Sequence, residues 1–365
     1  MILRDYQQRA VDWLRKRRRG MIVAPAGSGK TIISSAAIYA VLTAKLREGR
    51  PIIGWLANTL EQCQQARDAI AAFPAIEQSA DVRIACAAAD QDWSDVALLV
   101  VDELHHSTAP LWYRQIMTCQ GALWGMTATP ETGDPERDAQ LFEMFGESFV
   151  IDRSEVAHKL APAKVIMLPD TDPDMQRPMD AEIDRLFAIR SRYSRLPEGE
   201  LMAMVKWQVC VKMGIIENKA RNDAAVRTAL RHANDHVLIL VNQIEHGKEL
   251  AGRIPGSRMA FSKMGRKARA AAMDAFRSGE CRCLVATSLC DEGADIPIAD
   301  VLILVSAGRS ETKTVQRTGR VLRLHAGKSI ALIYDFVDSQ HGLMHKHSCR
   351  RQAIYARLGY DITHG

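Results

Sequence analysis

The stretch Met21-Ile-Val-Ala-Pro-Ala-Gly-Ser-Gly-Lys-Thr31 decides the fold of this chain. A short apolar run ends at Pro25, a glycine-rich turn follows, and Lys30 opens an alanine-rich segment of helical length. This order of strand, loop and helix is the context that a phosphate-binding loop needs. Glycines let backbone N–H groups converge on phosphate oxygens, and the N-terminus of a helix adds positive potential.

The same stretch assigns a role to each polar position. We expect Lys30 to reach the β- and γ-phosphates and the Thr31 hydroxyl to ligate Mg²⁺. The pattern G-x-x-x-x-G-K-[ST] is met except at its first position, which is Ala24. A Gly-Ser turn that merely precedes a helix is the alternative, and the Lys-Thr pair favours a nucleoside triphosphate site. The loop residues predicted to bind the nucleotide are Ala26, Gly27, Ser28, Gly29, Lys30 and Thr31.

A second chemical landmark is Asp95-Val-Ala-Leu-Leu-Val-Val-Asp-Glu-Leu-His-His106. Its continuous apolar run predicts a strand buried on both faces, as in parallel sheets. The strand delivers Asp102 and Glu103 at its carboxyl end, where open α/β sheets bind ligands. We expect Asp102 to hold Mg²⁺ through water and Glu103 to orient and deprotonate the attacking water. The alternative is a plain helix start; the adjacent His105-His106 pair lacks the spacing of a zinc site.

Composition sets the class of protein. A chain of 365 residues with 47% hydrophobic and 25% charged residues predicts a globular protein of two domains. The net charge of +5 permits a polyanionic partner without demanding one. Eight scattered cysteines without a C-x-x-C pair predict reduced thiols. No signal pattern or membrane-length apolar run is found, so we expect a cytoplasmic protein without membrane contact (in the host cytoplasm if phage-encoded).

The order of elements predicts two parallel sheets. Helices are expected at 3–14, 32–46 and 58–70, with strands at 51–56, 82–87 and 121–130 between and after them, the last one ending in hydroxyl residues. Proline and charge cluster over 160–178, which suggests a hinge and crossover, and a helical stretch follows from 180 to about 233. A second series of strands is expected at 236–241, 282–286, 300–305 and 329–336. The predicted parts are a first domain at 1–152, a crossover and helical segment at 153–235, and a second domain at 236–365.

A run of five cations, Arg15-Lys-Arg-Arg-Arg19, follows the first helix. Cations at a helix C-terminus complement its dipole, so a solvated helix end is the favoured interpretation. Contact with nucleic acid is the alternative.

Eight motifs in order resemble the superfamily 2 helicases of the DExH type. They are 4–7, 24–31, 56–62, 102–105, 127–130, 237–246, 285–297 and 316–323, and they run almost from end to end of the chain. The D-E-x-H form, Asp291-Glu-Gly-Ala-Asp-Ile-Pro297 and Gln316-Arg317 resemble the branch of phage branch-migration helicases, the excision-repair helicase and type III restriction motor subunits. The resemblance implies an α/β fold of two tandem RecA-like domains with a helical insert at the start of the second. It also implies ATP in the cleft and a nucleic-acid strand across both domains.

The resemblance also implies roles for matching residues. Gln7 would read the adenine edge, with Tyr6 or Arg4 packing on the base and Asp295 on the ribose. Further implied roles follow the same motifs: arginine fingers (Arg320, Arg323), coupling of the nucleotide state (Gln316, His105, Thr127, Thr129) and nucleic-acid contact (Asn58, Gln62, Lys263, Thr287). Solvated helix charges are the alternative for Arg317 and Arg323, and helix caps are the alternative for Thr59, Thr287 and Thr318.

Some positions depart from the family pattern. Ile84–Asp90 lacks the usual Thr-Tyr type contact residues, and Phe261-Ser-Lys-Met-Gly265 replaces a His-Gly pair. The tail offers His341, His345, His347 and Cys349, for which solvated positions on a helix are favoured over a zinc site.

The function predicted from these motifs is that of an ATP-dependent DNA helicase or translocase. ATP and Mg²⁺ are the expected cofactors and single-stranded or branched DNA the expected partner, with RNA less favoured and protein partners left open. The alternatives are a nucleotide-gated clamp on nucleic acid, or the motor subunit of a larger restriction or repair complex.

Overall fold

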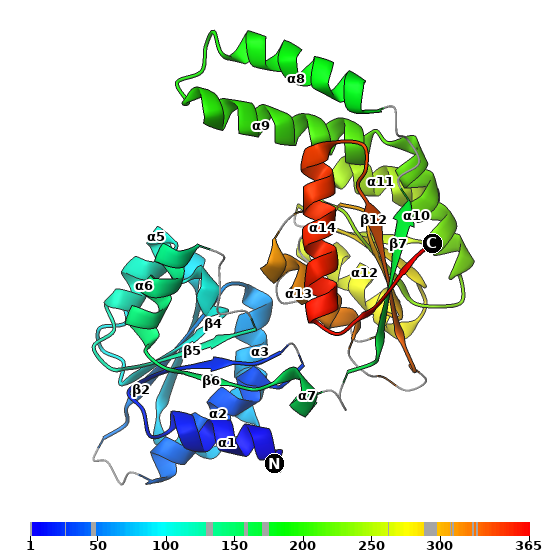
Figure 1. Ribbon diagram of the computed structural model, residues 1–365. Helices are drawn as coiled ribbons and strands as arrows, with labels where there is room; N and C mark the ends of the chain where they lie inside the picture. Colours follow the sequence, from blue (N-terminus) through cyan, green and yellow to red (C-terminus); the bar gives the residue numbers. More distant parts are fainter. Residues whose placement is uncertain are drawn as a thin grey trace. The chain divides into compact units, whose positions relative to one another are not determined.

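The structure is a computed structural model that describes most of the chain. The described residues are 2–25, 27–44, 49–128, 134–156, 160–169, 175–261, 263–287, 298–306, 308, 310–322, 325 and 328–365, without the side chains of 266, 311, 312, 316 and 320. The chain divides into two compact units between Leu160 and Ala161 (Figure 1). Unit 1 continues past the predicted end at 152, because α7 (Arg153–Val156) places Val156 in the same apolar core as Ile151.

Unit 1 contains a sheet of six parallel strands in the order β3-β2-β4-β5-β1-β6. The strands are β1 (Arg19–Val23), β2 (Ile52–Ala57), β3 (Asp81–Cys86), β4 (Leu98–Asp102), β5 (Ala122–Thr127) and β6 (Ser148–Val150). The strands expected at 51–56 and 82–87 and before Asp102 are confirmed, and the strand expected at 121–130 is present and ends at Thr127. The short edge strand β6 lies where the sequence predicted only the end of the domain.

Helices cover both faces of this sheet, because successive residues of its strands point to opposite sides. Ile22 and Val100 pack in one core with α1 (Asp5–Leu14), α2 (Lys30–Ala44) and α3 (Leu60–Ala71). Met21 and Leu99 pack in a second core with α5 (Pro110–Met117) and α6 (Pro135–Phe145). The short α4 (Ala75–Ser79) completes the first layer. Burial on both faces explains the continuous apolar runs of these strands.

Unit 2 contains a sheet of seven parallel strands in the order β13-β7-β12-β11-β8-β10-β9. The strands are β7 (Ala163–Pro169), β8 (Val237–Leu240), β9 (Arg258–Ala260), β10 (Cys283–Ala286), β11 (Val301–Leu304), β12 (Ala331–Val337) and β13 (Asp361–His364). The four predicted strands are confirmed. The prediction of a hinge over 160–178 is corrected, because β7 lies there and pairs with β12 along its whole length.

The helical stretch predicted from 180 to 233 is confirmed. It contains α8 (Gln176–Arg190), α9 (Glu198–Val211), a π-helical turn (Lys212–Ile216) and α10 (Lys219–Arg231). Figure 1 shows α8 and α9 as a hairpin at one end of unit 2. Met179, Ile183 and Val205 form a small core with Met344 of α14 (Gly342–Arg357), so the hairpin has its own apolar anchor. The other helices of unit 2 are α11 (Ile244–Gly252), α12 (Arg266–Ser278) and α13 (Glu311–Val321).

A buried ion network joins α10, β12 and α14 in unit 2. Arg351 donates from Nε to Asp335 Oδ2 at 2.7 Å and from Nη2 to Asp338 Oδ2 at 2.9 Å. Arg221 donates to Asp338 Oδ1 at 2.6 Å and packs over the Phe336 ring at 4.1 Å. All four charged side chains are at most 2% exposed, so their mutual pairing is what makes their burial tolerable.

The described residues contain neither a membrane-spanning helix nor a cluster of metal ligands. Among the helices that the structure describes, none is long and apolar enough to cross a membrane. Within the same described ranges, no cluster of three metal-ligating side chains occurs, including the histidine-rich tail. There, His345 lies 3.5 Å from Cys349 Sγ, and the His347 ring packs against Trp207.

Candidate nucleotide site in unit 1

The predicted phosphate loop connects β1 to α2 at the carboxyl edge of the first sheet. The backbone N–H of Ala24 donates to the Thr127 carbonyl at 2.9 Å, which joins the loop to the end of β5. Gly27 and Gly29 have φ values of +82° and +83°, in the left-handed region that favours glycine. A Cβ atom at Gly29 would also lie 2.7 Å from Gln7 Nε2. Both glycines are therefore required by the loop geometry.

The polar side chains of the loop are poised for an anion. Lys30 opens α2 and donates from Nζ to the Ala24 carbonyl at 3.1 Å. Ser28 is fully buried, and its Oγ atom makes no hydrogen bond within the described residues. Thr31 is half-buried in the first turn of the helix. A cationic side chain, a buried hydroxyl without a partner and the N-terminus of a helix of 15 residues together suit a phosphate group.

The N-terminal motif clamps this loop. Tyr6 Oη and Gln7 Nε2 both donate to the Ser28 carbonyl, at 3.1 and 2.9 Å. Gln7 Oε1 accepts from the Arg4 N–H at 3.1 Å, and the Arg4 guanidinium donates to Tyr6 Oη at 2.9 Å. Gln7 is only 6% exposed. The structure thus shows Gln7 supporting the phosphate loop, and its contact with adenine stays a prediction.

A cavity of about 950 Å³ lies beside the clamp, lined by Arg4, Asp5, Tyr6, Gln8, Arg9 and Glu155. Arg9 pairs with Glu155 of α7. The cavity borders the two side chains predicted to pack on a base, so it suits the base of a nucleotide held by the loop. No sequence pattern indicated Glu155, because it belongs to no motif and pairs with Arg9 only in the folded chain.

Asp102 lies at the end of β4, on the sheet edge that also carries the loop. Its Oδ1 atom accepts the Glu103 N–H at 3.0 Å. Burial raises the pKa of Asp102 to about 7, the nearby Glu103 charge adds to the rise, and Lys30 opposes it. A carboxylate in this environment favours a divalent cation, which stabilises the ionised form. Asp102 and Thr31 therefore fit the predicted Mg²⁺ site by position and by chemistry.

Glu103 has φ +52° and ψ +55°, in the left-handed region that non-glycine residues rarely adopt. Such a conformation costs about 1–2 kcal/mol, and it occurs mainly where function requires it. The Oε2 atom of Glu103 is buried without a hydrogen-bond partner in the described structure and lies 3.5 Å from His105 Nδ1. The strained turn and the desolvated carboxylate suit a group that accepts a proton from water.

The histidine pair after Glu103 is part of the packing around it. The rings of His105 and His106 lie 4.2 Å apart, and His106 stacks on Trp112 at 5.5 Å. His105 is thereby fixed beside Glu103, and its coupling role stays a prediction. Thr127 is fully buried at the end of β5.

One predicted nucleic-acid contact in unit 1 is corrected. Gln62 is 5% exposed, and its Oε1 atom accepts the N–H groups of Asn58 and Thr59 at 3.0 and 3.1 Å. Thr59 Oγ1 in turn accepts the Gln62 N–H, which completes a capping box at the start of α3. Gln62 therefore shapes the loop, and the alternative of a helix cap is confirmed for Thr59. Asn58 is half-buried, and its contact with nucleic acid stays a prediction.

In unit 2, predicted contact residues follow the carboxyl ends of neighbouring strands. Thr287 comes directly after β10, is 5% exposed, and donates from its N–H to the Ala260 carbonyl at 3.2 Å. Lys263 follows β9 and is exposed. Gln316 and Arg320 lie on α13, but their side chains are not described. The remaining predicted residues lie outside the described residues: Ala26, Thr129, Asp295 and Arg323.

The same edge of unit 2 holds a cavity of about 800 Å³ that the sequence did not predict. Lys206 and Trp207 of α9, Lys313 of α13 and His347 of α14 line it. Arg317, also in the lining, is 5% exposed and donates to the Ser306 carbonyl and to Asn242 Oδ1 at 3.1 and 3.2 Å. For Arg317 the alternative of a solvated helix charge is therefore wrong.

Two family models match parts of the chain. "Type III restriction enzyme, res subunit" matches residues 1–88, and "Helicase conserved C-terminal domain" matches residues 220–325. The first covers the phosphate loop, and the second covers β8 to α13.

Relatives match over most of the chain. The putative DNA 3'-5' helicase Rad25 of Halobacterium salinarum is 26% identical over 337 residues, covering 88% of this chain and 52% of its own length. The DNA 3'-5' helicase XPB of Mycobacterium tuberculosis is 24% identical, covering 98% and 64%. Putative helicase 22 of a Sulfolobus islandicus filamentous virus is 23% identical, covering 91% and 62%. The chain thus spans about half to two thirds of the length of these relatives.

The fold has a solved counterpart. The helicase domain of Pyrococcus furiosus Hef superposes with a TM-score of 0.54 and 17% identity, covering 97% of this chain and 98% of that one. The two parallel sheets and this match confirm the predicted fold class of two RecA-like domains. Together with the two family models and the relatives above, they support a superfamily 2 helicase related to repair helicases and to type III restriction subunits.

Proposed function

We propose that this chain is an ATP-dependent DNA helicase or translocase that moves in the 3'-to-5' direction. One observation carries the proposal. The phosphate loop and the Asp102–Glu103 pair meet at one edge of the unit 1 sheet, with Ser28 Oγ and Glu103 Oε2 buried and without hydrogen-bond partners in the described structure. The direction rests on the names of relatives that are called DNA 3'-5' helicases.

The chemistry follows from the groups at that edge. The backbone of the loop and Lys30 bind the phosphates, while Thr31 and Asp102 hold the cation. Bound Mg²⁺ would neutralise charge that develops on the phosphate oxygens. Glu103 orients the attacking water and accepts its proton. His105, 3.5 Å away, keeps this carboxylate in position.

The nucleotide state can reach the rest of unit 1 through the backbone. The Ala24 N–H to Thr127 carbonyl bond links the phosphate loop directly to the end of β5, where the motif 127–130 begins. Movement of the loop on hydrolysis therefore shifts the end of β5. This supports the coupling role proposed for Thr127.

For the DNA strand, we propose the carboxyl edge of unit 2 together with Asn58 of unit 1. Thr287, Lys263, Lys313 and Lys206 supply hydroxyl and cationic groups for phosphates, and Trp207 supplies an aromatic face for a base. Contacts of this type position a strand without reading its sequence. We therefore propose sequence-tolerant binding of single-stranded DNA, with forked or branched DNA as the working substrate.

The test compares ATP hydrolysis with single-stranded, forked and duplex DNA and with RNA, alongside strand displacement from substrates with 3' or 5' overhangs. We expect stimulation by single-stranded and forked DNA, and displacement only from the 3' overhang. Nucleotide-dependent binding without displacement would instead support the clamp. Activity that appears only with added subunits of a nuclease complex would support the motor subunit, which the restriction-subunit match over residues 1–88 favours as the second candidate.

A further inference from the structure

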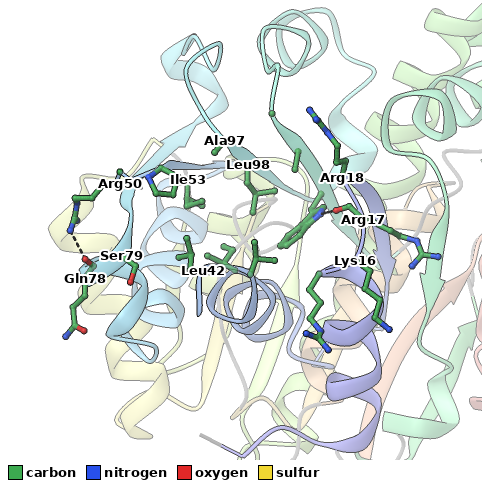
Figure 2. A pocket seen from close by; sticks show the side chains of 18 residues that line it. Lys16, Arg17, Arg18, Leu42, Arg50, Ile53, Gln78, Ser79, Ala97 and Leu98 are labelled. Atoms are coloured by element: carbon green, nitrogen blue, oxygen red, sulfur yellow. Dashed lines mark hydrogen bonds between the residues drawn. The ribbon is translucent and has the colours of Figure 1, made fainter. Parts of the chain in front are cut away.

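Unit 1 has a second cavity, of about 770 Å³, which the proposed function does not use. Its lining includes apolar side chains from α2 and from the beginnings of the central strands: Ile38, Leu42, Ile53, Leu98 and Trp124. In Figure 2 Leu42, Ile53 and Leu98 lie between two groups of cations, Arg50 on one side and residues 16–18 on the other. Ile38, Ile53, Leu98 and Trp124 are at most 5% exposed, so the half-buried Val41 and Leu42 supply most of the apolar surface that a ligand can reach. The cavity therefore combines a small apolar floor with a basic rim.

This cavity is separate from the nucleotide site. Ile53 and Leu98 lie at the amino ends of β2 and β4, whereas the phosphate loop follows the carboxyl end of β1. The five residues of β1 span about 17 Å at 3.3–3.4 Å per residue. A ligand in this cavity therefore occupies the opposite edge of the sheet from ATP.

The rim is positively charged and partly fixed in place. Arg15, Lys16, Arg17, Arg18 and Arg50 line the cavity, and none of the described lining residues is acidic. Carboxylates outside the lining pair with three of them: Asp12 with Arg15, Glu147 with Arg17 and Asp81 with Arg50. The charge that the rim offers a ligand therefore comes mainly from Lys16 and Arg18. Arg50 donates to the carbonyl groups of Gln78 and Ala80, at 2.7 and 3.0 Å. Arg17 packs over the Trp13 ring at 4.0 Å. Such anchoring holds guanidinium groups at the rim with little loss of side-chain freedom when a ligand binds.

Lys16 and Arg18 complete the rim from the end of α1. Both are exposed, and Arg18 donates to the Gln120 carbonyl at 3.2 Å. The basic run 15–19 is thus more than a solvated helix end, because it borders a cavity with an apolar floor.

The chemistry of the cavity favours a peptide over a nucleic acid. Phosphates and sugars would meet the cations but leave the apolar floor facing polar groups. Trp124 is 2% exposed and donates from Nε1 to the Arg17 carbonyl at 3.0 Å, so its ring cannot stack on a base. Aliphatic or aromatic side chains flanked by carboxylates satisfy both parts of the cavity.

We propose that this cavity docks a segment of a partner protein that presents apolar side chains flanked by Asp or Glu. The segment binds at the amino edge of the unit 1 sheet while the carboxyl edge remains open to nucleotide. A partner held there can recruit the chain without competing for the nucleotide.

The test selects peptides on the full-length chain. Random phage-displayed peptides of about 16 residues, four to five helical turns if helical, are panned on the wild type after depletion on a Lys16→Glu/Arg18→Glu double variant. Enriched peptides should combine acidic and apolar residues. In fluorescence anisotropy their affinity should fall about tenfold or more in the double variant and in Leu42→Asp. Arg67→Glu, an exposed charge reversal on α3, is the matched control and should bind as the wild type does.

Two results would overturn the proposal. One is the absence of acidic, apolar peptides from the enriched pool. The other is a double variant that keeps peptide affinity but loses binding of a duplex oligonucleotide, which would assign the rim to nucleic acid. ATP hydrolysis without DNA should be unchanged in the double variant, and thermal unfolding checks that Leu42→Asp folds. Because these readouts do not depend on DNA unwinding, the docking proposal and the proposed function fail separately.

Discussion

The two units share one architecture but treat buried charge in opposite ways. In unit 1 burial raises the pKa of Asp102, and Glu103 Oε2 has no hydrogen-bond partner in the described structure. In unit 2 burial alone would raise the pKa of Asp338, but the charges of Arg221 and Arg351 hold it below its ordinary value. The first arrangement leaves buried charge for a cation and phosphates to satisfy, and the second is satisfied within the protein. The residues at the strand ends, more than the sheet itself, therefore decide whether buried charge forms a chemical site or a structural one.

The largest effect is expected at the phosphate loop. Lys30→Ala should reduce ATP turnover by at least about 10²–10³-fold, because it removes a cation aimed at the transferred phosphate. The fold should stay intact, since the hydrogen bond of Lys30 Nζ to the Ala24 carbonyl lies within the loop itself. Steady-state hydrolysis measures the ATP turnover, and thermal unfolding measures the stability of the fold. Lys346→Ala, an exposed lysine on α14, is the control and should hydrolyse ATP as the wild type does.

Substitution in the buried ion network of unit 2 should affect the stability of the fold instead of catalysis. Arg351→Leu leaves Asp335 and Asp338 buried with less charge compensation, so unfolding of unit 2 should become easier by about 3–5 kcal/mol. Arg350→Leu, the exposed neighbour on the same helix, should stay within about 0.5 kcal/mol. Urea unfolding, followed by hydrogen exchange of unit 2 peptides, measures the stability of both variants. Equal stability of both variants would show that the network is not required.

A smaller effect is expected at the proposed strand-binding edge. Trp207→Ala should weaken binding of single-stranded DNA about fivefold or more, because one base loses its stacking partner. Hydrolysis without DNA should not change. Fluorescence anisotropy on an unstructured oligonucleotide provides the measurement, and Tyr113→Ala on α5 is the aromatic control. If Trp207→Ala binds DNA as tightly as the control, the cavity of unit 2 is not part of the strand path.

The last contrast between the two units is their pH dependence without Mg²⁺ or nucleotide. The folded-state pKa of Asp102 is raised to about 7, so unit 1 should lose stability as pH rises from about 4 to 7. Burial, aided by the Arg221 charge, lowers the pKa of His246 to about 4, so unit 2 should lose stability as pH falls from about 6.5 to 4.

Single substitutions should isolate these two contributions. Asp102→Asn should flatten the profile of unit 1, and His246→Gln should flatten that of unit 2. Five of the six tryptophans lie in unit 1, so their fluorescence follows that unit, while hydrogen exchange follows unit 2. A profile that either substitution leaves unchanged would show that the titration of that group does not contribute.

The sequence predicted the parts of the fold that depend on local patterns. Continuous apolar runs located β4, β8 and β11, because strands buried on both faces carry such runs. It missed β7, whose apolar residues stand between Lys164 and Pro169 and whose place in the sheet depends on pairing with β12, more than 150 residues away. Tertiary pairing of that kind leaves little trace in the local pattern.

Some features of the candidate site could also be predicted from local sequence patterns, and others could not. The glycine loop and the two acids were readable because they follow strands directly. Tyr6 and Gln7 bind the Ser28 carbonyl, and Trp207 and Lys313 line one cavity. Both arrangements join segments that are distant in sequence, so only the fold reveals them. For Gln62, the capping box Thr59-x-x-Gln62 was visible in the sequence and already indicated a local structural role.

The central claim is that unit 1 hydrolyses ATP through water positioned by Glu103, and Glu103→Gln tests it most directly. The substitution keeps the size of the side chain but removes the proton acceptor. DNA-stimulated turnover should fall by about 10²-fold or more, as general-base removal does, while binding of a fluorescent ATP analogue stays close to that of the wild type. Glu136→Gln, exposed on α6, should retain full turnover. Near-normal turnover of Glu103→Gln would contradict the account, because another group would then position the water.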